Sequence, residues 1–374
     1  MRRLTSLSVM AAVAAMALSG PAEARDLRVA AGAPPVHTAY NPLYSTFREL
    51  LPEMTGGTLG TTHLGTEVVT VGNMMAQLQS GVVEVGNLLP LFVPADLPNT
   101  ALTGDLAFLG RVPHAMAAAV DEYIVTCADC QAEFRAAGMV YLGTTSSDVY
   151  LLMTTRPVRT RADMAGMRLR AGGAAFARWA DAMGAAPTQV PVNEQFEAIS
   201  QGVLDGTMGS INDLVAFRLV DVIRHVTPVE LGTYHTSSAF TVNGDVWRGL
   251  SQADREGIAR AANVATALAT QDWGHERADI AREMALAAGI TFVEPDPALV
   301  TATEAFAEAD LATIAAQARD RYGIADGAGK IARFRALIEK WEAIAAEVGE
   351  DPAAMAERKQ AEIWDKVDWS TYGM

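Results

Sequence analysis

The chain has 374 residues, of which half are hydrophobic and a fifth are charged, and its formal net charge is −15 at pH 7. This balance is typical of a globular protein and argues against a disordered chain. The length exceeds what one hydrophobic core usually reaches, which favours two domains. The acidic charge disfavours nucleic acid as a partner, because phosphate contacts need clustered Lys and Arg.

Residues 1–24 have the pattern of a secretory signal peptide. Arg2 and Arg3 form a basic start, an apolar stretch runs from Leu4 to Leu18, and Ala22-Glu23-Ala24 is the small-x-small pattern that signal peptidase cuts after. The apolar stretch is too short for a membrane anchor, and the sequence has no later run of about 18 uncharged apolar residues. We therefore expect a periplasmic protein of 350 residues, secreted through a cleaved signal peptide.

The first predicted elements alternate between strand and helix. Apolar alternation, helical spacing and buried runs predict, in chain order, a strand over 26–32, a helix over 43–54, a strand over 58–63, a helix over 69–80 and a strand over 82–91. This order is the beginning of a doubly wound α/β domain.

The same alternation restarts in the second half. The patterns predict strands over 139–143, 149–154, 167–171, 223–231 and 239–243, an extended segment over 188–192, a strand or turn over 204–209, and helices over 174–183, 193–201, 253–288, 298–318 and 329–348. No low-complexity linker separates the halves, so we expect an α/β protein of two domains that share crossover strands, as in a hinged clamshell.

The expected division assigns several chain segments to each domain. Domain I covers 25–147, with about 234–275 returning to it, and domain II covers 148–233, with about 276–328 returning to it. Residues 329–374 form a C-terminal helical segment.

The two cysteines are Cys127 and Cys130, three positions apart. In an oxidising periplasm this spacing predicts a local structural disulfide. Free thiols and a redox function are the alternatives, because C-x-x-C also occurs at redox sites.

Motifs of enzymes and metal sites do not occur in the sequence. It contains no G-x-S-x-G, H-E-x-x-H, Walker or G-x-G-x-x-G pattern, and its six histidines have no partner at metal-ligand spacing. Ser146-Ser147-Asp148 with a distant histidine could form a triad in principle, but many chains of this length allow that. We expect no enzyme, cofactor or metal, and a periplasmic hydrolase is the alternative from another class.

Several short motifs follow one another in a fixed order. They are Thr55-Gly56-Gly57, His63-Leu64-Gly65, MAQLQSGVVEVG at 75–86, RADMAGMRLR at 161–170, MGAAP at 183–187 and VPVNEQFEAISQGVLDG at 190–206. Behind a signal peptide, this composite resembles the periplasmic substrate-binding proteins of tripartite ATP-independent periplasmic (TRAP) transporters, the DctP-like family. The resemblance extends from about Leu27 to Gly289.

The resemblance implies both a fold and a function. The fold is a two-domain clamshell of the periplasmic-binding-protein type, with hinge strands and a long connecting helix. The function is that of an extracytoplasmic solute receptor, which closes on a small organic anion and delivers it to the TRAP membrane permease subunits. The receptor itself is a monomer or a homodimer.

The resemblance also points to Arg170, on the strand after the D-x-x-G turn, as the residue that binds the ligand carboxylate. A guanidinium offers a planar fork that matches a carboxylate, and such a charge-assisted pair is strong in a dry cleft. Strand alternation places Arg168 on the same face, so spacing alone leaves Arg168 as the alternative.

Departures from the family pattern narrow the expected ligand. One branch of the family has a second arginine where this chain has Tyr150, and many relatives have Asn near the position of Gly209, beside which Asn212 stands here. These differences predict a monocarboxylate with an apolar or aromatic body, with a sulfonate or zwitterionic solute as the alternative. Further candidates for the cleft are Asn87, at the end of a strand, together with Tyr234 and His235.

Overall fold

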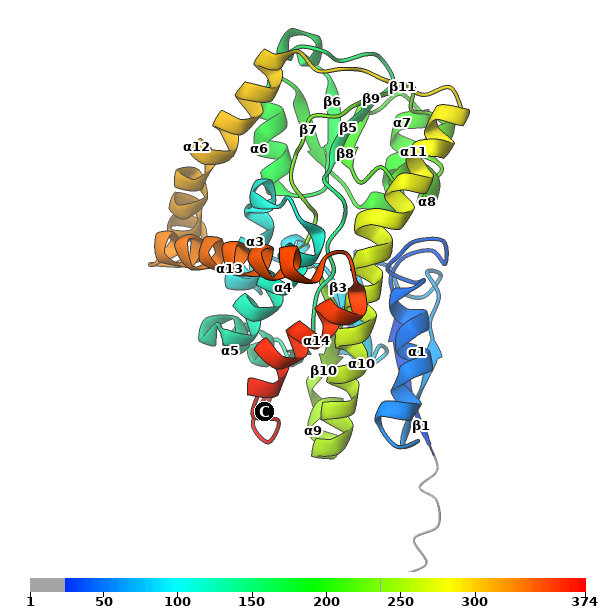
Figure 1. Ribbon diagram of the computed structural model, residues 1–374, viewed down its shortest axis with the longest axis vertical. Helices are drawn as coiled ribbons and strands as arrows, with labels where there is room; N and C mark the ends of the chain where they lie inside the picture. Colours follow the sequence, from blue (N-terminus) through cyan, green and yellow to red (C-terminus); the bar gives the residue numbers. More distant parts are fainter. Residues whose placement is uncertain (1–23, 236) are drawn as a thin grey trace, which may run out of the picture.

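A computed structural model of the protein describes residues 24–235 and 237–374. Apart from Ala24, the expected signal peptide lies outside the described residues. The described chain forms two α/β domains, each built around one β-sheet. Figure 1 shows the two domains one above the other, with one long helix running along both.

The sheet of the first domain is mostly parallel. Its strands are β1 (Arg25–Ala30), β2 (Leu59–His63), β3 (Val85–Leu88), β4 (Met139–Tyr141) and β10 (Ser238–Asn243), in the order β2-β1-β3-β10-β4. β1 pairs in parallel with β2 and β3, while β10 lies antiparallel between β3 and β4. All residues of β3 and β10 are buried, which explains why these segments lack a polar alternation.

The sheet of the second domain also contains antiparallel pairs. Its strands are β5 (Leu151–Thr154), β6 (Arg168–Ala171), β7 (Ala186–Gln189), β8 (Gly206–Gly209), β9 (His225–Thr227) and β11 (Thr291–Phe292), in the order β11-β9-β5-β8-β6-β7. β6 is parallel to β7 and β8, and β5 is antiparallel to β8 and β9.

Two extended segments carry the chain between the sheets, one from β4 to β5 and the other from β9 to β10. They lie side by side: the Tyr150 amide donates to the Gly232 carbonyl at 2.8 Å, and the Ser147 amide donates to the Tyr234 carbonyl at 2.9 Å. These crossing segments are the expected hinge strands, and they border the space between the domains.

Helices cover both faces of the two sheets. Those up to β10 are α1 (Leu43–Met54), α2 (Met74–Gln79), α3 (Pro98–Asp105), α4 (Pro113–Thr126), α5 (Ala128–Ala136), α6 (Ala174–Ala182), α7 (Gln195–Ser200) and α8 (Asp213–Ala216). The later ones are α9 (Gly244–Gly249), α10 (Gln252–Gln271), α11 (Arg277–Ala287), α12 (Pro297–Tyr322), α13 (Gly327–Val348) and α14 (Pro352–Glu362).

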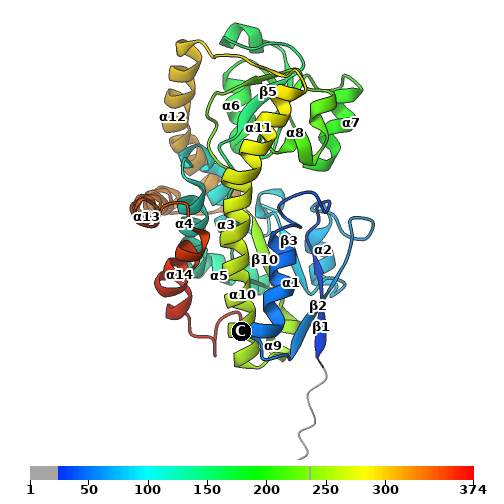
Figure 2. The ribbon, with the colours of Figure 1, turned by 45° about the vertical axis from the view of Figure 1, so that its right-hand side comes forward.

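The connecting helix consists of α10, a π-helical turn over Asp272–Glu276, and α11. α10 packs against α1, α4 and α14 of the first domain, and α11 packs against α8 of the second. Buried alanines such as Ala261, Ala265 and Ala269 allow α10 to be approached closely from several sides. Figure 2 shows this helix passing from one domain to the other.

The helices after α11 return to the first domain. Leu299, near the start of α12, packs into the core of the second domain, whereas Ile314, nearer its end, packs into the core of the first. Phe334 and Trp341 of α13 and Met355 of α14 are buried in that same first-domain core. The C-terminal helices α13 and α14 therefore pack on the first domain, beside which Figure 1 shows them.

Several predicted boundaries were wrong. The strand predicted over 82–91 is limited to β3, because Pro90 has no N–H for the ladder and begins a 3-10 turn. The helix predicted over 69–80 begins only at Met74, since Asn73 accepts a hydrogen bond from the Thr70 amide in a turn. β9 covers three of the nine residues predicted over 223–231.

Candidate ligand-binding site

The two arginines of β6 have opposite environments. The Arg168 side chain is half exposed and pairs with Asp205, with 2.8 Å between Nη2 and Oδ1. Arg170 is only 3% exposed; its Nε donates to the Val190 carbonyl at 3.1 Å, and its buried Nη1 has no hydrogen-bond partner among the described residues. Because an unpaired buried charge costs several kcal/mol, Arg170 is suited to receive an anion.

Gly172 makes room for the Arg170 guanidinium. A Cβ atom at Gly172 would lie 3.0 Å from Nη1, closer than such atoms normally approach. The glycine therefore allows the guanidinium to lie over the backbone that leads from β6 to α6.

Arg170 lines a cavity between the two domains. The lining comes from both domains, both crossing segments and the π-helical turn: Gly32, Ala33, Pro34, His37, Ala39, Val71, Asn87, Leu89, Phe92, Thr145, Tyr150, Arg170, Val192, Asn193, Asp213, Phe217, Tyr234, Ser237 and Trp273. The centres of water molecules can occupy about 60 Å³ of it. One water needs about 10–15 Å³ by this measure, so the cavity holds about four to six waters, the space of a small ring with one substituent.

Aromatic rings form much of the cavity wall. Tyr150 stacks between Phe176, at 5.0 Å, and Tyr234, at 5.8 Å between ring centroids. Trp273 contacts Tyr234 and also His37, which meets it edge-on at 5.5 Å. Flat, apolar ring faces of this kind suit a planar or apolar ligand body.

Five lining residues carry a buried polar atom that has no hydrogen-bond partner among the described residues. These atoms are Nη1 of Arg170, Nε1 of Trp273, the hydroxyl of Tyr234, Oδ1 of Asn87 and Oδ2 of Asp213. Buried polar atoms in folded proteins are nearly always paired. The set contains both donors and acceptors, so the cavity is built for a polar ligand with an apolar body.

The charges of the lining are few. Arg170 is the one Lys or Arg among the described lining residues, and Asp213 is the one Asp or Glu. Burial raises the pKa of Asp213 to about 6, against the opposing attraction of Arg170. Burial lowers the pKa of His37 to about 4, so its ring is neutral at pH 7; because its Nδ1 accepts from the Ala39 amide, Nε2 carries the proton.

Four of the residues singled out from the sequence lie together in this cavity. Arg170, Tyr150, Asn87 and Tyr234 all contribute to its lining. Their elements are far apart in the chain: β6, the first crossing segment, the end of β3 and the second crossing segment.

Three others lie outside the lining. His235 is held by Thr233 Oγ1 and the Thr103 carbonyl, each 2.9 Å from a ring nitrogen, and it faces a neighbouring cavity. Asn212 is buried beside the lining. Gly209 leaves room for the Asp213 carboxylate, because a Cβ atom at Gly209 would lie 2.6 Å from Asp213 Oδ2.

The sequence interpretation missed His37, Asp213 and Trp273. His37 stands in the loop between β1 and α1, and Asp213 directly follows the candidate Asn212. For neither residue does the sequence show which of several neighbouring side chains faces the cavity. Trp273 had no signal, because the π-helical turn that sets its direction interrupts the helical period.

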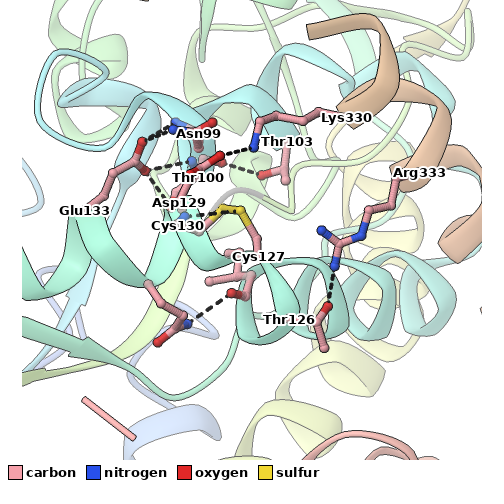
Figure 3. Close-up of a disulfide and its surroundings, with 12 residues drawn as sticks. Asn99, Thr100, Thr103, Thr126, Cys127, Asp129, Cys130, Glu133, Lys330 and Arg333 are labelled. Carbon is pink, nitrogen blue, oxygen red and sulfur yellow. Dashed lines mark hydrogen bonds and ion pairs between the residues drawn. A yellow bond between two sulfur atoms is a disulfide. The ribbon is translucent and has the colours of Figure 1, made fainter. Parts of the chain in front are cut away.

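The cysteines lie in the first domain, away from the lining. A disulfide joins Cys127, between α4 and α5, to Cys130 in the first turn of α5, as Figure 3 shows. Around it, Glu133 accepts a hydrogen bond from the Asn99 amide at 2.7 Å, and Lys330 of α13 pairs with Asp129. The disulfide therefore belongs to the packing of α3, α5 and α13.

Within residues 24–235 and 237–374, no group of three or more His, Cys, Asp or Glu side chains is arranged to hold a metal ion. No helix in that part of the chain is both long and apolar enough to cross a membrane.

Solved structures of similar proteins share this fold. A TRAP periplasmic solute-binding protein from Bordetella bronchiseptica, solved with (R)- and (S)-mandelate, is 25% identical, with 84% of this chain and 99% of that chain covered and a TM-score of 0.73. A TRAP solute-binding protein from Rhodoferax ferrireducens, with copurified benzoate, is 18% identical over 86% and 99%, with a TM-score of 0.76. A Bordetella pertussis extracytoplasmic solute receptor binding pyroglutamic acid is 18% identical over 83% and 99%, with a TM-score of 0.71.

The model of one protein family matches most of the chain. That family is described as bacterial extracellular solute-binding protein, family 7 (DctP), and the match covers residues 29–318. It confirms the resemblance inferred from the ordered motifs, and the neighbours confirm the two-domain α/β fold. The chain therefore belongs to family 7 of the bacterial extracellular solute-binding proteins, the DctP family of TRAP solute receptors.

Proposed function

We propose that this receptor binds a small organic monocarboxylate in the cavity between its domains and delivers it to a TRAP membrane permease. The observation that carries the proposal is Arg170, which is buried, forms no ion pair with a described residue and lines an aromatic cavity. Its guanidinium can bind both oxygens of a carboxylate, and a dry site strengthens that pair.

The charges of the lining favour one carboxylate over two. A second carboxylate would need a second cation, and the described lining offers none besides Arg170. Asp213 would also repel it. This argues against C4-dicarboxylates, and a sulfonate or zwitterion is the alternative that the same charges allow.

The size and the walls of the cavity favour a compact, flat ligand body. The rings of Tyr150, Tyr234 and Trp273 suit a single aromatic ring or a short keto acid. Among the similar proteins, one was solved with mandelate and another with benzoate, both single-ring monocarboxylates.

The activity we propose is binding without chemical conversion. Differential affinity of the open and closed states is enough for a receptor, and no step needs a nucleophile or a cofactor. If the ligand is recovered unchanged after prolonged incubation and denaturation, the protein is no hydrolase of that compound. Appearance of a product in proportion to protein and time would contradict this part of the proposal.

The test of ligand class is mass spectrometry of the small molecule that co-purifies with the protein, followed by a thermal-shift panel. The panel compares benzoate, phenylpyruvate and short keto acids with succinate, malate and fumarate. We expect a rise in melting temperature with at least one monoacid and none with the diacids. Micromolar binding of succinate, with no response to the monoacids, would overturn the proposal.

Export through a cleaved signal peptide completes the proposed role. We expect the mature protein recovered from the periplasm to begin at Arg25, as N-terminal sequencing would show. A protein that retains Met1 and stays in the cytoplasm would contradict the proposed export.

A further inference from the structure

Asp213 is a second charged group in the cavity, and carboxylate binding at Arg170 leaves it without a role. It is the first residue of α8 and is 2% exposed, and its Oδ2 is buried without a hydrogen-bond partner among the described residues. Gly209 leaves the space that this carboxylate occupies, since a Cβ there would lie 2.6 Å from Oδ2. The second domain is therefore shaped to hold an acid at this position.

Asp213 does not neutralise Arg170 by direct contact. No ion pair joins them in the described chain, although Arg170 attracts the carboxylate at longer range. A ligand that carries only a carboxylate would satisfy Arg170 and leave Asp213 facing a like charge. A buried acceptor that loses water without gaining a donor weakens binding, and a charged acceptor weakens it more than a neutral one.

The nearest protein donor to Asp213 is the Gln195 side-chain amide. Its Nε2 acts on the carboxylate and opposes the rise of the Asp213 pKa, but neither Nε2 nor Asp213 Oδ2 has a hydrogen-bond partner of normal geometry among the described residues. The Gln195 oxygen accepts from Thr207 Oγ1 at 3.0 Å. Asp148, also buried, acts as a like charge, and Asp213 in turn raises the pKa of the Tyr150 hydroxyl. On the opposite wall, Asn87 offers another unpartnered acceptor, because its Nδ2 already donates to the Ala31 carbonyl.

We propose that Asp213 determines specificity by accepting a hydrogen bond from an O–H or N–H group of the ligand. The receptor then selects monocarboxylates that also carry a donor, such as hydroxy, lactam or amino acids, over the same acids without it. This inference rests on the proposed function, in which the ligand carboxylate binds Arg170.

The preference is tested with acid pairs that differ in one donor. Calorimetry at pH 7.5 would compare mandelate with phenylacetate, 3-hydroxybenzoate with benzoate, lactate with propionate, and phenylalanine with 3-phenylpropanoate. The last pair distinguishes an ammonium donor from the neutral ones. We expect the donor-bearing acid to bind at least about tenfold more tightly in at least one pair, because its partner leaves a buried charge unsatisfied.

Two variants assign that preference to Asp213. Asp213→Leu has similar size and no polar atom, and it should reduce the preference to less than about threefold, chiefly by improving the binding of the donor-free acid. Asp213→Asn keeps the shape and removes the charge, and serves if the leucine variant does not fold. The control is Asp221→Leu, at an exposed position paired with Arg218 in the same domain, which should leave the preference unchanged.

Equal affinities within every pair, or a preference that persists in both Asp213 variants, would overturn the inference while leaving a carboxylate receptor intact. If no acid of any pair binds the wild-type protein, the proposed function fails, and this inference fails with it.

Discussion

Arg168 and Arg170 stand two residues apart on one strand, yet only one of them has its charge balanced by a described residue. Arg168 is near the surface, where Asp205 and water both solvate it. Arg170 is enclosed between the domains, where its Nη1 has no hydrogen-bond partner among the described residues. Comparing substitutions at Arg168 and Arg170 therefore distinguishes the effect of a buried guanidinium from the effect of a positive charge on β6.

Arg170→Lys should weaken ligand binding strongly although the charge is kept. An ammonium cannot reproduce the two-pronged geometry, and an imperfectly paired buried carboxylate costs at least about 2 kcal/mol, or about 30-fold in affinity. Arg168→Lys is the matched control and should change affinity little, because exposed ion pairs contribute about 0–1 kcal/mol. Equal losses from the two variants in calorimetry would remove Arg170 from the site.

Binding of a donor-free acid such as benzoate should depend on pH through Asp213. The pKa of this residue is raised by burial to about 6 in the free protein. A bound carboxylate should raise that pKa further, so binding takes up a proton. Affinity should then increase as the pH falls from 8 to about 6, by up to about tenfold per unit, and level off below it.

The groups that also act on Asp213 set the control for this measurement. Arg170 opposes the rise of its pKa, and Asp148, with a pKa raised by burial to about 7, adds a like charge. Asp213→Asn should abolish most of the pH dependence between 6 and 8. If the dependence survives in that variant, Asp148 is the group that titrates.

The sequence identified part of this site and could not identify the rest. Ordered motifs pointed to Arg170, but strand alternation could not separate it from Arg168, because both lie on one face of β6. The pairing of Arg168 with Asp205 favours Arg170 as the ligand residue, and that pairing depends on Asp205, which directly precedes the neighbouring strand β8. Asp213 was missed beside the candidate Asn212, and Trp273 had no signal, because neither the four-residue helix α8 nor the π-helical turn shows a regular apolar spacing.

Among the elements, the ion pairs of α6 connect the two domains. Arg178 of α6 contacts Asp105 of α3 and Asp310 of α12, each with 2.8 Å between Nη and Oδ atoms. The α6 helix belongs to the core of the second domain, while Leu102 of α3 belongs to that of the first. The Arg178–Asp105 ion pair thus joins the two domains in this conformation.

Asp105→Asn should weaken this link and spare the pair with Asp310. A partly buried ion pair of this kind is worth about 1 kcal/mol, so ligand affinity should fall about fivefold as the open state gains population. Glu308→Gln, which removes an exposed α12–α13 pair with Arg335, is the control and should leave affinity unchanged. Indistinguishable affinities for the two variants would contradict a role for Asp105 in closure.

The disulfide should affect stability and not binding. It closes a loop of about four residues, for which chain entropy gives about 2 kcal/mol of stabilisation. Replacing Cys127 and Cys130 together by serine should lower the free energy of unfolding by up to that amount, since a serine hydroxyl can still cap α5 as the Cys127 Sγ does now. Denaturant unfolding measures the loss, and a large fall in ligand affinity would contradict the prediction.

Predicted elements were most accurate where one face of a helix is buried. The bounds of α1 match the prediction residue for residue, and its buried Leu43, Phe47 and Leu51 follow the helical repeat. The α4 helix was not predicted, because residues 113–121 are all buried and so show no amphipathic stripe. Its neighbours α3 and α5 were missed with it.

At the scale of the whole molecule, two crossing segments and the connecting helix link the domains. Segments that pair with each other along the hinge restrict the domains to rotation about it. The residue boundaries we propose for the domains, near 147, 233 and 275, all fall at or next to these links. Because both domains line the cavity, a ligand contacts the whole lining only when the domains are closed.

Ligand binding should therefore both stabilise and compact the protein. At a free ligand concentration 100-fold above the Kd, linkage adds about 2.7 kcal/mol, which corresponds to a rise in Tm of about 4 °C. Small-angle scattering should show a smaller radius of gyration in the same samples. A ligand that raises Tm and leaves the radius unchanged would contradict closure of the domains.

The π-helical turn of the connecting helix has an optical consequence. Of the six tryptophans, Trp273 is the one that lines the cavity, and it sits where the helix passes from one domain to the other. Its indole emission should respond to an arriving ligand while the other five report a constant background. The protein thus carries its own fluorescent probe, and stopped-flow mixing of the wild type, with Trp273→Phe as the silent reference, would time capture and release without an attached dye.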